Sequence, residues 1–254
     1  MEPNLATDEN GPRRFATTRW SLVLAAGANS EGMGRAAVAE LCQLYWRPVF
    51  DFICRRGHST TDAQDLTQDF FVGVLEGNLL QSADPERGRF RSLLLKALQY
   101  FLNDELQKHR AKKRGGDVEF ISWDDWMAEG PTEVILSQQA LDSSTPERLF
   151  DIRWAATVVE RSMARLKEEC AARGRRRVFD GLSGCLAADR ADISYTELGA
   201  SLGVGEPQVK RLLHQIRVRF RSLLREEVAR TVESEADVED ELRHLCAALV
   251  AGSK

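Results

Sequence analysis

Residues 194–228, SYTELGASLGVGEPQVKRLLHQIRVRFRSLLREEV, contain two helical patterns separated by a short turn. Ser194 and Glu197 have the spacing of a capping box, in which two side chains satisfy the free backbone donors at the start of a helix. The turn is GVG at 203–205, and Pro207 suits the first turn of the second helix, because its missing N–H is not needed there. Two helices joined by a short glycine turn are typical of a helix-turn-helix.

The second helix of this pair combines an apolar face with a basic outer face. In a helix-turn-helix, the first residues of the second helix meet base edges in the major groove of DNA. Gln208 and Arg211 are suited to bidentate base contacts. Lys210, Arg217 and Arg219 are better suited to phosphates. The alternative is a helical hairpin with a solvated basic face, and the cap, the turn and the acid-free outer face together favour DNA binding. The residues predicted to contact DNA on this helix are Glu206, Gln208, Lys210, Arg211, His214 and Arg217.

Charge is segregated along the chain, although the net charge of its 254 residues is only −4. Residues 87–114 contain nine Lys or Arg against two acids, and residues 208–225 contain six Lys or Arg and no acid. Residues 226–241 reverse the sign, with eight acids against Arg230. This asymmetry indicates an anionic partner at two places, and an acidic tail that could compete with that partner.

The segment 61–71, TDAQDLTQDFF, predicts an amphipathic surface helix. Thr61 and the glutamine three residues later have capping-box spacing, and apolar residues at helical spacing define a buried stripe. Asp65, Gln68 and Asp69 fall at i, i+3 and i+4, so they form one polar patch away from that stripe. An acidic patch of this kind is a candidate docking face for a basic partner.

Residues 88–114 predict a long basic helix that also carries aromatic residues. Unstacked bases can rest on aromatic rings while cations hold the backbone, so this combination suits single-stranded or melting DNA. Tyr100 is left open as a base contact, with Lys96 and Arg110 elsewhere on the helix. The other apolar residues are better explained as the core face of the helix, namely Phe90, Leu94, Leu98, Phe101 and Leu102.

Nearly every periodic segment predicts a helix, and no strand pattern of useful length occurs. Residues 115–150 are rich in Gly, Pro, Ser and acids and have no sustained period, so they are interpreted as a linker. An amphipathic helix at 237–249 could cover a face of the second domain. Further helices are expected over about 17–27, 33–56, 62–76, 152–173, 177–187 and 195–202.

Other kinds of site find little support in the sequence. The five cysteines are scattered and lack CxxC spacing, which favours free thiols in a reducing compartment. Cys42, Cys54 and His58 could be imagined as metal ligands, but both cysteines fall on or beside an apolar helical pattern, which favours structural thiols. No metal, cofactor or catalytic residue is therefore predicted. No apolar run is long enough to span a membrane and no signal-peptide core occurs, so a cytoplasmic protein is expected.

These segments together resemble a sigma factor of bacterial RNA polymerase, of the small extracytoplasmic-function (ECF) type. The resemblance covers roughly 35–114 and 150–230. The acidic segment matches the family signature Asp-x-x-Asp-Leu-x-Gln-x-x-Phe at Asp62, Asp65, Leu66, Gln68 and Phe71. The resemblance implies an all-α fold of two helical domains joined by a long linker, with the helix-turn-helix in the second domain.

The resemblance also implies that different parts of the chain have different functions. A domain at 31–114 would bind core polymerase and recognise and melt the −10 element, and a domain at 151–232 would read the −35 element. An N-terminal extension at 1–30, a linker at 115–150 and an acidic C-terminal helix at 233–254 complete the chain. The expected partners are core RNA polymerase, promoter DNA and an anti-sigma factor or other regulator, with no membrane contact.

Two sets of residues are carried over from the resemblance. Many relatives carry Trp where Leu93 stands and Asn near Tyr100, so no base preference at the −10 box is implied. The expected polymerase-binding residues are Asp62, Asp65, Gln68 and Asp69. The expected −10 contacts are Arg91, Lys96, Tyr100, Asp104, Arg110, Lys112, Lys113 and Arg114.

Two rival functions are weighed beside this one. A stand-alone helix-turn-helix regulator would bind its DNA tightly without polymerase and would use a helix such as 237–249 to self-associate. An enzyme on a helical bundle would use paired carboxylates such as Asp65 and Asp69 with His58. These carboxylates have no clustered His, glycine-rich phosphate loop or nucleophile elbow beside them, which disfavours the enzyme.

Overall fold

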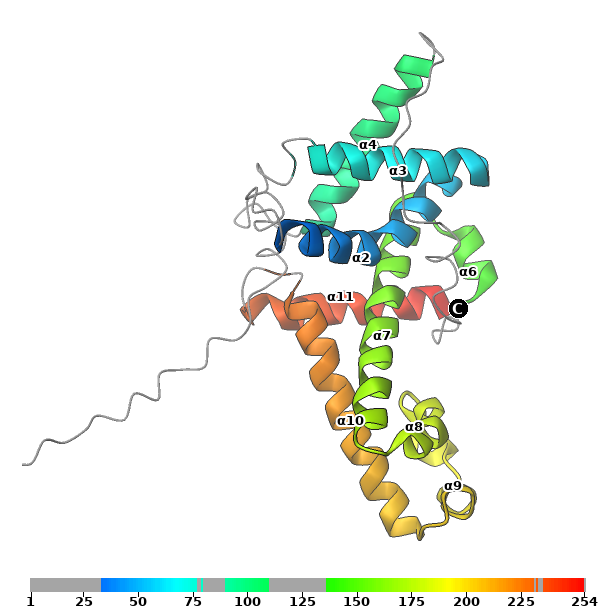
Figure 1. Ribbon diagram of the computed structural model, residues 1–254. Helices are drawn as coiled ribbons and strands as arrows, with labels where there is room; N and C mark the ends of the chain where they lie inside the picture. The colour runs from blue at the N-terminus through cyan, green and yellow to red at the C-terminus, as the bar shows by residue number, and fades with distance from the viewer. Residues whose placement is uncertain are drawn as a thin grey trace, which may run out of the picture.

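The computed structural model describes residues 33–76, 79, 90–109, 136–230, 232 and 235–253, and every regular element within them is helical (Figure 1). The all-α prediction is therefore confirmed for the described residues. The helix expected at about 17–27 lies outside them. Two short 3-10 turns, η2 (Ser183–Cys185) and η3 (Arg190–Asp192), connect α8 to α9. The α-helices are α2 (Met33–Arg55), α3 (Thr60–Glu76), α4 (Phe90–His109), α6 (Gln138–Ser143), α7 (Pro146–Ala172), α8 (Arg176–Leu182), α9 (Tyr195–Leu202), α10 (Glu206–Ala229) and α11 (Glu235–Ser253).

Helix α3 begins earlier than the sequence pattern predicts. The Ser59 hydroxyl accepts a hydrogen bond from the Asp62 backbone N–H at 3.1 Å and donates one to the Asp62 carboxylate at 2.7 Å. Ser59 therefore caps the helix, and the predicted capping pair of Thr61 and Gln64 is wrong, since both lie inside α3. Gly57 allows the chain to turn between α2 and α3, because its φ of 96° is a conformation that glycine adopts readily.

The predicted linker is wrong over its last part. Residues 115–135 lie outside the described residues, but α6 and the start of α7 occupy most of 138–150. Ser137 caps α6 and Thr145 caps α7, each hydroxyl accepting a backbone N–H three residues ahead. Pro146 then begins α7, where a proline is well tolerated. These local start signals outweigh the polar composition that favoured a linker.

The larger hydrophobic core joins α2, α3 and α4 to the C-terminal half of the chain. Phe150, Trp154 and Val158 of α7 belong to this core, as do Val238 and Leu245 of α11. Trp154 has no exposed surface, and α2 packs across α7 (Figure 1). The helices of the two predicted domains are therefore packed together in this structure.

A second core lies at the opposite end of α7, where α8 and α9 pack against α10 (Figure 1). Met163 and Leu166 of α7 and Leu213 and Ile216 of α10 form part of this core. Val159 of α7 packs against both cores. The 27 residues of α7 span about 40 Å at about 1.5 Å per residue, long enough to cross from one core to the other.

A buried carboxylate joins α2, α7 and α10 between the two cores. Glu227 of α10 is only 2% exposed. The guanidinium groups of Arg165, Arg230 and Arg161 lie 2.9, 3.1 and 3.6 Å from its oxygens. Arg161 also pairs with Glu40 of α2 at 3.1 Å. Burial of a carboxylate is unfavourable unless cations compensate it, so these contacts fix the three helices at one point.

Helix α11 is part of the folded body and connects to α4 through a buried ion pair. The amphipathic helix expected at 237–249 is confirmed and is longer than expected. Arg91 of α4 is 6% exposed, and its guanidinium donates hydrogen bonds to the Glu241 carboxylate at 2.8 Å and to Asp151 of α7. The guanidinium also lies 4.9 Å from the ring centroid of Trp154. Arg91 was expected to contact DNA, but in this structure it is buried because α11 and α7 supply its anions.

Arg91→Met is expected to lower the free energy of unfolding by about 3–5 kcal/mol, because the Glu241 carboxylate loses its buried cation. Denaturant unfolding at neutral pH measures this loss. Arg243→Met is the matched control, since Arg243 forms an exposed ion pair with Asp240 on α11, and its effect should stay below about 1 kcal/mol. Adding Glu241→Leu to Arg91→Met should restore much of the stability. Equal effects of Arg91→Met and the control would contradict a buried pair between α4 and α11.

Candidate DNA-binding and partner-binding surfaces

The turn between α9 and α10 depends on two glycines. Gly203 ends α9 with a φ of 71°, in the left-handed region that side chains with a Cβ avoid. A Cβ on Gly199 would lie 2.7 Å from the Val204 carbonyl oxygen, so only glycine lets the turn pack this closely on α9. The predicted capping box is wrong in one respect: Ser194 precedes α9 as expected but makes no capping hydrogen bond with its side chain. The turn fixes the angle at which α10 begins.

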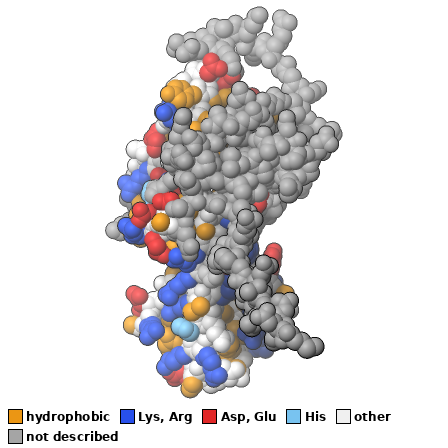
Figure 2. Space-filling model, turned by 90° about the vertical axis from the view of Figure 1, so that its left-hand side faces the viewer, with side chains coloured by type: hydrophobic (Ala, Val, Ile, Leu, Met, Phe, Trp, Pro, Cys, Tyr) orange, Lys and Arg blue, Asp and Glu red, His pale blue; other side chains and the backbone are white. Residues whose placement is uncertain are grey.

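Most of the predicted DNA contacts on α10 lie exposed along its first turns. Gln208, Arg211 and His214 are exposed, and among the described residues they have no hydrogen-bond or ion-pair partner through their side chains. The Lys210 ammonium lies 2.6 Å from the Glu206 carboxylate, one turn earlier on the same exposed surface. Figure 2 shows Lys and Arg side chains gathered over this end of the molecule. A surface of this charge attracts an anionic partner.

Arg217 and Arg219 are engaged within the protein, which differs from the prediction that they contact phosphates. The Arg217 guanidinium donates hydrogen bonds to the backbone carbonyls of Cys185 and Ala188 at 2.7 and 2.6 Å. The Arg219 guanidinium binds both oxygens of the Glu169 carboxylate at 2.7 and 2.5 Å. Both positions flank the buried stripe of α10, so their side chains reach neighbouring elements. A phosphate contact by either residue would require these bonds to break.

The four expected polymerase-binding residues lie on α3. Asp62, Asp65 and Asp69 are exposed, and Gln68 is half-buried. Partial burial raises the pKa of Asp69, and the neighbouring carboxylates of Glu105 and Asp65 raise it further. Negative charge is thus concentrated where α3 meets α4. A cationic partner at this surface would relieve the repulsion between these carboxylates.

Helix α4 presents an accessible surface beyond its first two residues, which are buried. Lys96, Tyr100 and Asp104 are exposed, and the side chain of Tyr100 is 66% exposed. The predicted core face is buried at Phe90, Leu94, Leu98 and Leu102, and its other member, Phe101, is partly buried against the same core. Among the described residues of the predicted −10 set, the accessible ones are therefore Lys96, Tyr100 and Asp104. The other members of that set, Arg110, Lys112, Lys113 and Arg114, lie outside the described residues.

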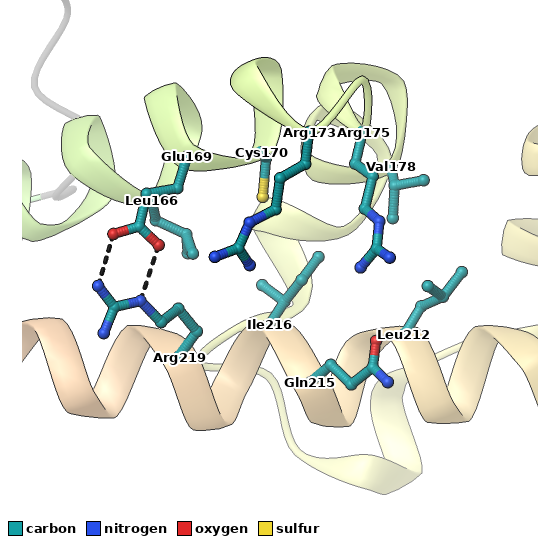
Figure 3. A pocket seen from close by; sticks show the side chains of 10 residues that line it. All are labelled: Leu166, Glu169, Cys170, Arg173, Arg175, Val178, Leu212, Gln215, Ile216 and Arg219. Carbon is teal, nitrogen blue, oxygen red and sulfur yellow. Dashed lines mark hydrogen bonds and ion pairs between the residues drawn. The ribbon is translucent and has the colours of Figure 1, made fainter.

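A cluster of arginines between α7 and α8 was not singled out by the sequence patterns. The run RGRRR at 173–177 joins these helices, and Arg173 and Arg175 extend toward α10 (Figure 3). The density of arginine was the available signal. The arginine cluster becomes a candidate site only because α10 packs beside the run, and no local sequence pattern reveals that contact.

The described part of the chain offers no metal centre. There, no three His, Cys, Asp or Glu side chains are grouped closely enough to hold a metal ion. Burial raises the pKa of the Cys42 thiol to about 12, as expected of a structural cysteine. None of the helices in the same residues has the length and apolar character needed to cross a membrane.

The comparison with protein families identifies the chain. A model of the family described as ECF sigma factor matches residues 51–226. This span, well over half of the chain, begins near the end of α2 and includes the acidic α3, all of α9 and all but the last three residues of α10. No curated protein and no solved structure gives a significant match. The chain belongs to the ECF sigma factor family.

Proposed function

We propose that this sigma factor directs core RNA polymerase to a set of promoters and helps to melt them. In this proposal α3 binds core polymerase, α4 reads and opens the −10 element, and the α9–α10 pair reads the −35 element. Promoter melting by polymerase requires no catalytic residue in this chain, and none is proposed. An anti-sigma factor or another regulator is a further partner that the family resemblance predicts.

The observation that carries the proposal is the family match over a span that contains both candidate surfaces. Helix α3 supplies an exposed acidic side, and α10 supplies an exposed basic one. The two surfaces suit partners of opposite charge, a basic region of polymerase and the DNA backbone. A chain with both surfaces suits a subunit that links polymerase to DNA.

The shape of the molecule also supports two separated DNA contacts. Promoter boxes about 16–20 base pairs apart lie roughly 55–70 Å apart at about 3.4 Å per pair. Helix α4 and the α9–α10 turn lie toward opposite ends of the molecule, with α7 between them (Figure 1). The net charge of −4 favours weak binding to free DNA, so polymerase would supply the remaining affinity.

In vitro transcription from a genomic library with purified core polymerase tests the proposal. We expect transcripts from a defined set of promoters only when both the chain and the core polymerase are present. Sequencing their 5′ ends would then give the −10 and −35 elements. Tight and specific DNA binding by the chain alone, without promoter-specific transcripts, would contradict the proposal and favour a stand-alone regulator.

Asp65→Lys should weaken binding to core polymerase by roughly tenfold or more, because a cation would replace an anion opposite a basic partner. A titration of fluorescently labelled chain with core polymerase measures the dissociation constant. Circular dichroism checks that the variant remains folded.

Glu168→Lys is the matched control for this variant. Glu168 is exposed on α7, outside α3, and undergoes the same change of charge. We expect the control to bind core polymerase nearly as well as the wild-type chain. If Asp65→Lys and Glu168→Lys bind with equal affinity, α3 is not the docking surface.

A further inference from the structure

A cavity of about 60 Å³ lies between the end of α7, the start of α8 and the middle of α10 (Figure 3). Leu212 and Ile216 form part of its apolar lining, and Arg173, Arg175 and Gln215 add polar groups. In Figure 3 the Arg173 and Arg175 side chains extend from the α7–α8 connection toward α10. Their guanidinium groups face the same space.

Three arginines and one acid line this cavity, so positive charge is in excess there. Arg173 and Arg175 have no ion-pair partner among the described residues. Glu169 is the acid among the lining residues, and Arg219 already binds both of its oxygens. The hydrogen bonds from Arg219 lower the pKa of Glu169 most, and the nearby charge of Arg173 also lowers it. Both side chains are exposed, so water screens the repulsion between them, and an anion between the two guanidinium groups would be attracted by both.

The other two arginines of the same run are engaged elsewhere. Arg176 forms an ion pair with Asp180 at 3.0 Å, one turn along α8. Arg177 donates a hydrogen bond to the Ser201 backbone carbonyl at 3.0 Å. The run therefore divides into two arginines that line the cavity and two that do not, which provides an internal control.

We propose that Arg173, Arg175 and Gln215 bind one phosphate group of the DNA backbone beside the −35 element. This proposal rests on the proposed function, since it adds a contact to the same DNA-reading end. A guanidinium group presents paired N–H donors that match two phosphate oxygens, and the Gln215 amide adds a neutral donor. The apolar lining limits water on one side, which strengthens these charged hydrogen bonds.

The position of the cavity along α10 suits a backbone contact better than a base contact. Gln215 lies seven residues after Gln208, so it is about 10 Å further along the helix at about 1.5 Å per residue. The major groove of DNA is about 8.5 Å deep. If α10 enters the groove by its N-terminal end and Gln208 reaches base edges, Gln215 lies near the level of the phosphates.

The test measures DNA binding by the full chain in complex with core polymerase. The DNA is a duplex with the promoter elements found by the transcription survey, and the affinity is measured from about 50 to 200 mM salt. The pocket variant is Arg173→Gln/Arg175→Gln. The matched control is Arg176→Gln/Arg177→Gln, which removes the same charge from the same run.

The slope of log affinity against log salt is about −0.9 for each phosphate neutralised. The pocket variant should therefore have a slope about one unit shallower than that of the wild-type complex, while the control keeps the wild-type slope. A methylphosphonate scan, in which single backbone phosphates are replaced by neutral linkages, locates the contact. One such replacement beside the −35 element should lower the DNA affinity of the wild-type complex and leave that of the pocket variant unchanged.

Three results would overturn the assignment while leaving the proposed function in place. An unchanged slope in the pocket variant would show that no phosphate is bound there. Equal changes in the pocket variant and the control would show a diffuse basic surface. Calorimetry with inorganic phosphate tests whether the cavity binds free phosphate instead of DNA. Binding heat with the wild-type chain but not with the pocket variant, together with an unchanged salt slope for DNA binding, would assign the cavity to free phosphate. If the wild-type complex selects no promoter, the proposed function itself fails and this assignment fails with it.

Discussion

The fold depends on the burial of α7 in two hydrophobic cores at once. Phe150 and Trp154 near its start pack with α2, α4 and α11, and Leu166 near its end packs with α8 and α10. Neither core is complete without α7, because a helix stripe is stable only when another element covers it. The buried Glu227 adds a polar constraint at the crossing point, since its arginines come from α7 and from the residue that follows α10. Stability at one end of the molecule is thereby coupled to stability at the other.

This coupling bears on function because the two candidate interaction surfaces belong to different cores. Helix α3, with the acidic side, packs in the larger core, and the first turns of α10 pack in the smaller one. A partner that fixes α3 therefore also orients α10 through α7. The buried Arg91–Glu241 ion pair also connects the C-terminal helix α11 to α4 in the larger core. Residues 238 and 245 of α11 fill the larger core, so removing this helix would expose apolar surface as well as removing acidic charge.

The sequence predicted helices well where strong local signals existed and failed where tertiary contacts decided the outcome. The α9–α10 pair was predictable because Gly203 and Pro207 specify their positions by backbone geometry. The start of α7 was missed because a polar composition outweighed its capping signal at Thr145. The burial of Arg91 was not predictable, since its partner Glu241 lies 150 residues away in the sequence. The same reason applies to the arginine-lined cavity, which exists only because α10 folds back beside residues 173–175.

If α7 holds α3 and α10 in one rigid body, the distance between those helices has a single value in solution. Gly73 on α3 has open space around its Cα, and Val218 on α10 is half exposed, so both positions accept a spin label. Labels attached through non-natural amino acids leave the five native cysteines in place. Pulsed electron paramagnetic resonance on the free chain should give one narrow distance distribution between the two labels. A broad distribution, or two separate populations, would contradict the account by showing that the two ends of the molecule move independently.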